Sequence, residues 1–174
     1  MCITKTLGPT VILPTLPYEI TPISATQSQS IDGRNAGFAV DKDLMTGSLI
    51  EPSIENGVMW LRLDFDKTYF IHTITIHTSF YTNWYYPDSS CLKHVDIYKG
   101  CKDATNKNLD IMVYQTGAPV TCATLHQEYG LDKHDQIYTF ACSRPGDMVM
   151  LSSTSGTIEV YEVVVTSTGN LYQT

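Results

Sequence analysis

The stretch MWLRLDFDKTYFIHTITIHT, residues 59–78, decides the fold class. Its first seven residues alternate, with Leu61 and Leu63 on one face and charged side chains between them. Its last eight residues are rich in β-branched side chains and place Ile74 and Ile76 on a common face. A period of two over such lengths is typical of half-buried β-strands. The stretch therefore predicts two strands.

Shorter segments of similar character recur along the chain. They are residues 95–97, 112–114, 137–140, 148–151 and 158–165. Gly, Asn, Asp, Ser and Pro clusters separate them, and no segment keeps a helical period over three turns. No internal repeat is visible. The pattern predicts an all-β sandwich or barrel.

The overall composition indicates one globular domain in 174 residues, with 43% apolar and 17% charged residues. The net charge of −7 makes nucleic acid and anionic membrane surfaces poor partners, because both are bound through clustered Lys and Arg. Prolines at positions 9, 14, 17 and 22 predict an extended arm or linker over residues 1–22, laid against the domain. The sandwich is expected over residues 23–168, and residues 169–174 form a tail.

Five cysteines are spread through the chain: Cys2, Cys91, Cys101, Cys122 and Cys142. None has the CxxC spacing of a zinc site, and their scatter in a β-rich chain favours disulfides and therefore a secreted or extracellular protein. Their odd number leaves one unpaired or joined to another chain, and Cys2 is the natural remainder. Free thiols in a cytosolic protein are the alternative.

Catalysis has the weakest support among the function classes. His72 and His77 lie five residues apart on one predicted strand, so their side chains point to opposite faces. No nucleophile elbow, phosphate-binding glycine loop or HExxH motif is present. The sequence therefore predicts a non-catalytic protein.

A cation site is indicated by the turn AVDKDLMTGS, residues 39–48. Oxygen-bearing side chains stand at Asp41, Asp43, Thr46 and Ser48. Calcium takes six to eight hard oxygen ligands, and a turn of this kind supplies several from one place.

Glu162 is the second indication of a cation site. It has the same parity as Val160 and Val164, so strict alternation buries its carboxylate. A buried charge needs a partner, a metal ion or a proton. A calcium ion between Glu162 and the turn would satisfy it; an ion pair with Lys or Arg, or a bulge that turns it to solvent, are the alternatives.

Several motifs together resemble two related families. Residues 25–28 (ATQS), 36–41 (AGFAVD) and 60–65 (WLRLDF) are similar to the opening of discoidin-type domains. Residues 140–149 (FACSRPGDMV) and 160–165 (VYEVVV) are closer to F-type lectins. The resemblance spans roughly residues 23–168. It implies an eight-stranded jelly-roll β-sandwich of the galactose-binding-like kind, which in F-type lectins binds fucose and a structural calcium ion.

The resemblance also implies particular residue roles. Its calcium ligands fall on Asp41, Asp43, Ser48 and Glu162, with the carbonyls of Phe38 and Tyr161 as further ligands. Cys122 with Cys142 resembles a family disulfide. The family's A-V-D-G-N turn reads Asp41-Lys42-Asp43 here, and the family cysteine before the final Glu is Tyr161.

The fucose site of F-type lectins is where the chain departs from the family. The family's histidine falls at Glu51, and its two arginines fall near Trp84 and Cys91. The adjacent cysteine pair is absent from the sequence. Two cationic hydrogen-bond donors are therefore lost and an anion stands in place of a third donor, so the usual mode of fucose binding is not expected.

An aromatic segment stands near these positions. Residues 79–88 read SFYTNWYYPD, with five aromatics in seven positions. Such side chains give a large contact area and keep a polar group, although they also serve to cap a core. The predicted ligand residues are Glu51, Tyr81, Asn83, Trp84, Tyr85 and Tyr86. They lie on two loops, residues 47–56 and 79–91, at one end of the predicted sandwich.

Four functions are then ranked. The first is a secreted, calcium-stabilised, lectin-like module that binds a glycan or glycoprotein. The second is a protein-interaction or adhesion module that has lost sugar binding. A membrane-surface domain and an enzyme follow, and the ligand and oligomeric state stay open.

Overall fold

The computed structural model describes residues 16–50, 57–80, 108–115, 118–125, 133–154 and 158–169. These residues form strands β1 (Tyr18–Ile20), β2 (Ser24–Gln27), β3 (Ser48–Ile50), β4 (Met59–Phe80), β5 (Leu109–Gln115), β6 (Ala118–Leu125), β7 (Lys133–Ser153), β8 (Ile158–Val160) and β9 (Glu162–Ser167), with one short 3-10 helix, η1 (Ala36–Ala39). The strand pairs are antiparallel. The predicted all-β fold is confirmed.

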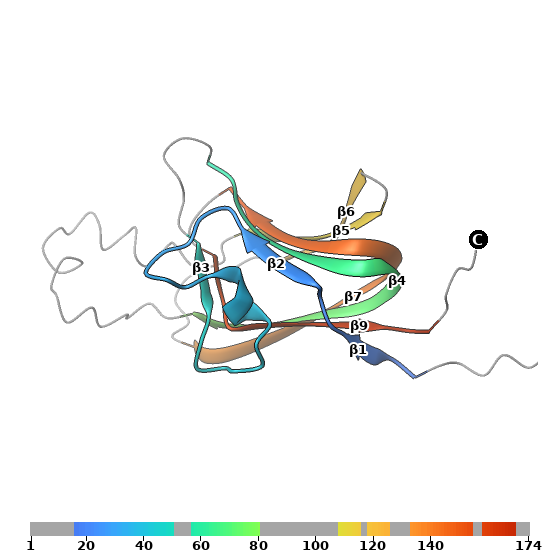
Figure 1. Cartoon of the computed structure of the whole chain (residues 1–174), viewed down its shortest axis with the longest axis horizontal. Helices are drawn as coiled ribbons and strands as arrows, with labels where there is room; N and C mark the ends of the chain where they lie inside the picture. Colours follow the sequence, from blue (N-terminus) through green and yellow to red (C-terminus); the bar gives the residue numbers. More distant parts are fainter. Residues whose placement is uncertain are drawn as a thin grey trace, which may run out of the picture.

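Strands β4 and β7 build both layers of the sandwich. Seven strands form one sheet in the order β1-β9-β4-β7-β5-β6, with β2 also on β4, and β3 pairs with β8. Figure 1 shows β4 and β7 bending together from the upper layer into the lower one. The register of the pair shifts between Asp64 and Tyr69, where the strands bend. The two strands predicted within residues 59–78 are therefore one bent strand, and residues 137–140 and 148–151 are likewise parts of β7.

The core lies between the two layers and follows the predicted alternation. Leu61, Leu63, Ile74 and Ile76 are at most 1% exposed, which confirms the predicted inward faces of β4. Each such side chain stabilises the fold by about 1.5–3 kcal/mol. The disulfide between Cys122 and Cys142, implied by the resemblance, is also confirmed and links β6 to β7. The other three cysteines lie outside the described residues.

The two ends of the sandwich differ in what they hold. At one end β1 pairs with β9, with Tyr18 opposite Ser167, so the chain enters and leaves the domain there. Strand β1 lies within the predicted arm and packs along the sheet. At the other end Ile50 pairs with Ile158 and Phe80 with Lys133. Because the segments predicted to bind a ligand start here, we call this second end the recognition end (Figure 1).

Candidate functional site

The predicted ligand segments begin at the recognition end. Glu51, Tyr81, Asn83, Trp84, Tyr85 and Tyr86 themselves lie outside the described residues. Ile50 is the last residue of β3 and Phe80 the last of β4. Strand β8 contacts both β3 and β4: Ile158 pairs with Ile50, and the carbonyl of Glu159 accepts a 2.6 Å hydrogen bond from the Thr78 hydroxyl. The two segments therefore begin at neighbouring points of the fold.

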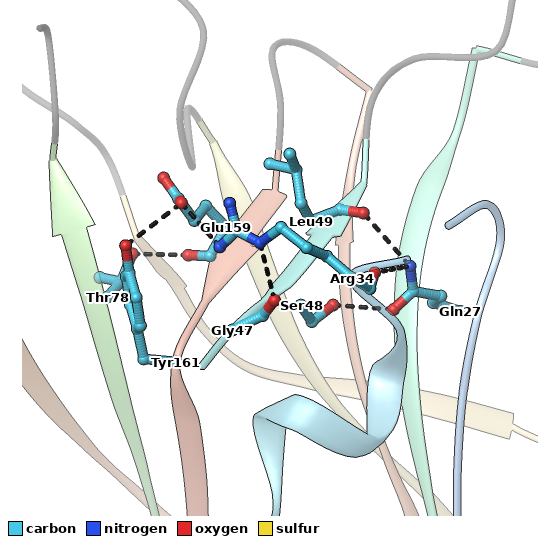
Figure 2. A network of polar contacts seen from close by, with 8 residues as sticks. All are labelled: Gln27, Arg34, Gly47, Ser48, Leu49, Thr78, Glu159 and Tyr161. Carbon is cyan, nitrogen blue, oxygen red and sulfur yellow. Dashed lines mark hydrogen bonds and ion pairs between the residues drawn. The ribbon is translucent and has the colours of Figure 1, made fainter. Parts of the chain in front are cut away.

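A buried ion pair lies beneath these strand ends. Arg34 Nη2 is 2.9 Å from Glu159 Oε1, and its Nε donates to the carbonyl of Gly47 at 2.9 Å (Figure 2). The Glu159 side chain is 3% exposed and that of Arg34 18%. Tyr161 donates its hydroxyl to the same Glu159 oxygen at 3.3 Å. The carboxylate thus receives both a countercharge and a hydrogen bond, which a buried anion requires.

Gln27 extends this cluster to β2 and β3. Its Oε1 accepts from the Ser48 hydroxyl at 2.8 Å, and its Nε2 donates to the carbonyls of Arg34 at 3.1 Å and Leu49 at 3.2 Å. We call the eight residues drawn in Figure 2 the Arg34 network: Gln27, Arg34, Gly47, Ser48, Leu49, Thr78, Glu159 and Tyr161. Within the described part of the chain, no buried side-chain nitrogen or oxygen lacks a hydrogen-bond partner.

Gly47 permits the close approach of these groups. A Cβ atom at this position would lie 2.9 Å from Arg34 Nη2, 3.2 Å from the Tyr161 ring and 3.2 Å from the carbonyl of Val160. The residue therefore allows Arg34 to pass directly beside β8.

The turn predicted to bind a cation is tightly organised by its own side chains. Asp41 Oδ1 accepts from the amide of Asp43 at 2.9 Å, and its Oδ2 accepts from the Thr46 hydroxyl at 2.7 Å. Asp43 Oδ1 accepts from the amide of Met45 at 2.9 Å. Lys42 has a left-handed φ of 65° and donates its amide to Glu162 Oε2 at 2.9 Å. This hydrogen bond holds the turn that carries Asp41 against Glu162 of β9.

Glu162 is buried as predicted, at 6% exposure, but for a different reason. Tyr161 is a bend between β8 and β9, so the parity of the two strands differs. In β9 the buried Val163 and Val165 face the core, opposite Ile76 and Ile74. Glu162 pairs with His77 on the outer face, where the Lys42 amide contacts it. The turn, and not the sandwich interior, encloses its carboxylate.

The environment of Glu162 is rich in negative charge. Burial raises the pKa of its carboxyl above 4.5, and the nearby Asp41 and Glu19 raise it further, while the Lys42 amide opposes them. The Lys42 ammonium is 3.0 Å from Glu19 Oε1. Removing carboxylates from water while other anions stand close makes this turn chemically suited to a cation.

The other predicted calcium ligands, Phe38, Ser48 and Tyr161, lie in η1, in β3 and between β8 and β9. Phe38 lies in η1 and donates its amide to the carbonyl of Asn35, and the amide of Tyr161 donates to the carbonyl of His77. Ser48 instead donates its hydroxyl to Gln27, in the Arg34 network. The hydroxyl that contacts Asp41 belongs to Thr46. Thr46 is part of the sequence pattern but was not predicted as a ligand.

Over the described ranges, no three His, Cys, Asp or Glu side chains form a group that could hold a metal ion by themselves.

Arg34, Gln27 and Glu159 were not among the site residues predicted from the sequence. Glu159 lies between Ile158 and Val160, and all three residues of β8 are buried, so the alternation that predicts an exposed residue fails there.

Comparison with known proteins supports the fold. No family model matches the chain, and no curated protein matches its sequence. Among solved structures, the family 32 carbohydrate-binding module of Clostridium perfringens NanJ, in complex with galactose, has a TM-score of 0.59 and 14% identity over 87% of this chain and 100% of that one. An F5/8 type C domain from Bacteroides fragilis has a TM-score of 0.56 and 13% identity over 83% and 91%.

A fucolectin from striped bass (Morone saxatilis) serum also matches, with a TM-score of 0.58 and 14% identity over 83% of this chain and 45% of the fucolectin chain. In a truncated chain with CBM32 and alginate lyase domains, the match covers 34% of that chain. The protein therefore has the galactose-binding-like jelly-roll fold of discoidin-type domains and F-type lectins, as predicted. In the part of the chain that the structure describes, no helix is long and apolar enough to span a membrane.

Proposed function

We propose that the protein is a secreted glycan-binding module whose ligand site lies at the recognition end. The observation that carries this proposal is the shared fold with a module described in complex with galactose and with a fucolectin. Ile50 and Phe80, which precede the two predicted ligand segments, both end strands at that place. The two segments therefore start from the same end of the sandwich.

The residues proposed to contact the glycan divide by chemistry. Trp84, Tyr81, Tyr85 and Tyr86 offer aromatic faces for the C–H faces of sugar rings, and Asn83 offers hydrogen bonds to hydroxyls. Glu51 accepts hydrogen bonds from hydroxyl groups and repels anions. With a net charge of −7, the chain is suited to neutral sugars and not to sulfated or sialylated ones.

A glycan array tests this proposal, with free galactose and fucose as competitors. We expect binding to neutral glycans that Trp84→Ala weakens about tenfold or more. Tyr18→Ala is the matched control, because Tyr18 is an aromatic residue, 45% exposed, at the opposite end. Absence of binding to any glycan, by a folded protein in calcium, would refute the carbohydrate function.

We also propose that the 41–46 turn and Glu162 hold a structural calcium ion. Asp41, Thr46 and Glu162 supply side-chain oxygens, Asp43 lies in the same turn, and the carbonyls of Phe38 and Tyr161 are the further ligands that the resemblance suggests. A bound cation would offset the repulsion among these carboxylates and fix the turn on β9. Ser48, the remaining ligand that the resemblance suggests, donates its hydroxyl hydrogen to Gln27 and keeps its oxygen lone pairs.

Thermal unfolding with calcium and with EDTA tests the metal proposal. At a calcium concentration of about 100 times Kd, linkage predicts a rise in Tm of roughly 5–10 °C. Glu162→Gln should abolish the rise, whereas Glu19→Gln, which removes a neighbouring charge outside the ligand set, should leave most of it. Equal Tm values with calcium and EDTA would refute calcium binding.

A protein partner is the second candidate function. It is favoured by Glu51, Trp84 and Cys91, which stand at or near the positions of the family's sugar-binding histidine and two arginines. An array without binding, together with a Tm that still falls in EDTA, would make this candidate the leading one. Trp84→Ala and Tyr85→Ala would then be compared for loss of a purified partner.

A further inference from the structure

We infer that the Arg34 network is a positioning device that holds the starting points of both ligand segments as one unit. The consequence for ligand binding rests on the proposed function. The coupling of the two starting points does not, because it concerns two stretches of described backbone. We call them the β3 root, residues 47–50, and the β4 root, residues 77–80.

The β3 root is held by two side chains from elsewhere in the sequence. Arg34 Nε binds the carbonyl of Gly47 at 2.9 Å. Gln27 accepts from the Ser48 hydroxyl and donates to the carbonyl of Leu49. Three consecutive residues, the last of them two positions before Glu51, are thereby fixed to side chains that are themselves partly buried.

The β4 root is held by β8 and the bend that follows it. The Thr78 hydroxyl, on a residue that is 2% exposed, donates to the carbonyl of Glu159 at 2.6 Å. The amide of Tyr161 donates to the carbonyl of His77 at 2.9 Å. The root of the segment that carries Trp84 therefore depends on the position of β8.

Glu159 connects the two roots. Its main-chain carbonyl binds Thr78, and its side chain binds Arg34, which in turn binds Gly47. Arg34 makes these contacts through two different nitrogens of one planar group, which a lysine ammonium cannot reproduce with the same geometry. Figure 2 shows this continuous chain of contacts across the strands that end there.

A positioning role of this kind matters for a site built from two segments. Recognition depends on groups held to within a fraction of an ångström, and the supporting contacts set that precision. If one contact of the network is broken, both roots should loosen, because Glu159 and Arg34 serve both.

The test uses two substitutions at opposite ends of the network, Arg34→Lys and Thr78→Val, in the full chain. Arg34→Lys keeps the charge beside Glu159 but loses the two-pronged geometry, and Thr78→Val keeps the shape but loses the hydroxyl. Arg62→Lys is the matched control for the first, since the Arg62 guanidinium pairs with Asp64, which is not a member of the network. Thr73→Val is the control for the second, since Thr73 lies on the same strand and bonds Thr166.

The readout is amide hydrogen exchange in the native state, under conditions where every variant is fully folded. We expect each substitution to speed exchange about tenfold or more at both roots, including the one that it does not contact, with residues 61–63 unchanged. The two controls should leave both roots as in the wild type. If each variant loosens only the root that it contacts, or neither root, the inference is overturned.

Glycan affinity is then measured for the same four variants. Arg34→Lys and Thr78→Val should lose about tenfold and the controls none. If the wild type binds no sugar, the proposed function fails, while the exchange experiment still decides whether the network holds the two roots together.

Discussion

Two glutamates three residues apart, Glu159 and Glu162, are both buried, yet their carboxylates have different partners. Glu159 is 2% exposed and receives the Arg34 guanidinium and the Tyr161 hydroxyl. Glu162 is 6% exposed and receives the main-chain amide of Lys42, while the ammonium of that lysine pairs with Glu19. One negative charge is neutralised within the fold; the other is held among further anions, as suits a site for an external cation.

The difference corresponds to two roles. Glu159 joins strands and belongs to the recognition end. Glu162 fastens an acidic turn to β9, and burial raises the pKa of its carboxyl, so the charged form is disfavoured; the proposed calcium ion would offset this. Four substitutions test this contrast.

Removing the charge of Glu159 should have the largest effect. Glu159→Gln removes the carboxylate that Arg34 Nη2 contacts at 2.9 Å in a largely buried site, which should lower the free energy of unfolding by about 3–5 kcal/mol. Urea denaturation measures it. Asp64→Asn removes the anion of the more exposed Arg62 pair and should cost less than about 1 kcal/mol. Equal losses in the two variants would contradict the importance assigned to burial.

Gly47→Ala should have an intermediate effect. The added methyl group would meet Arg34 Nη2 at 2.9 Å and force Arg34 or β8 to move. Overpacking of this kind lowers the free energy of unfolding by about 1–3 kcal/mol. A variant as stable as the wild type, with the Arg34–Glu159 pair intact in its crystal structure, would show that the approach is not constrained.

Glu162→Gln should raise the free energy of unfolding relative to the wild type in the absence of calcium, whereas the two preceding substitutions lower it. Because the pKa of Glu162 is raised in the folded state, that state binds more protons just above pH 4.5, and its stability falls as the pH rises through that window. The stability of Glu162→Gln relative to the wild type should therefore increase from pH 4.5 to neutral pH in EDTA. Urea denaturation across this range would oppose the account if the relative stability of the variant fell.

Lys42→Gln should have the smallest effect. The Lys42 ammonium forms an exposed pair with Glu19, and its link to Glu162 runs through the main-chain amide, which the substitution keeps. Tm in EDTA should change by less than about 2 °C. A much larger fall would mean that the ammonium, and not the amide, neutralises Glu162.

The sequence predicts the fold better than it predicts the site. Alternation along residues 59–78 identified the inward faces correctly, since it depends only on local spacing. The two strands predicted in this stretch are one strand with a bend between Asp64 and Tyr69. The polar residues of this bend resemble those of a turn, so the sequence pattern does not distinguish the two. The burial of Glu162 was predicted, but its cause required knowledge of the bend at Tyr161. The Arg34–Glu159 pair joins residues 125 positions apart, a contact that local patterns in one sequence do not encode.

The most direct test of the central claim is an NMR titration of isotope-labelled protein with galactose, and with the strongest ligand from the glycan array. The account predicts chemical-shift changes at Ile50, Thr78 and Ile158, beside the predicted ligand segments, and none in Tyr18–Ile20 at the opposite end. Shifts confined to the β1–β9 end, or to the 41–46 turn, would contradict the placement of the site at the recognition end.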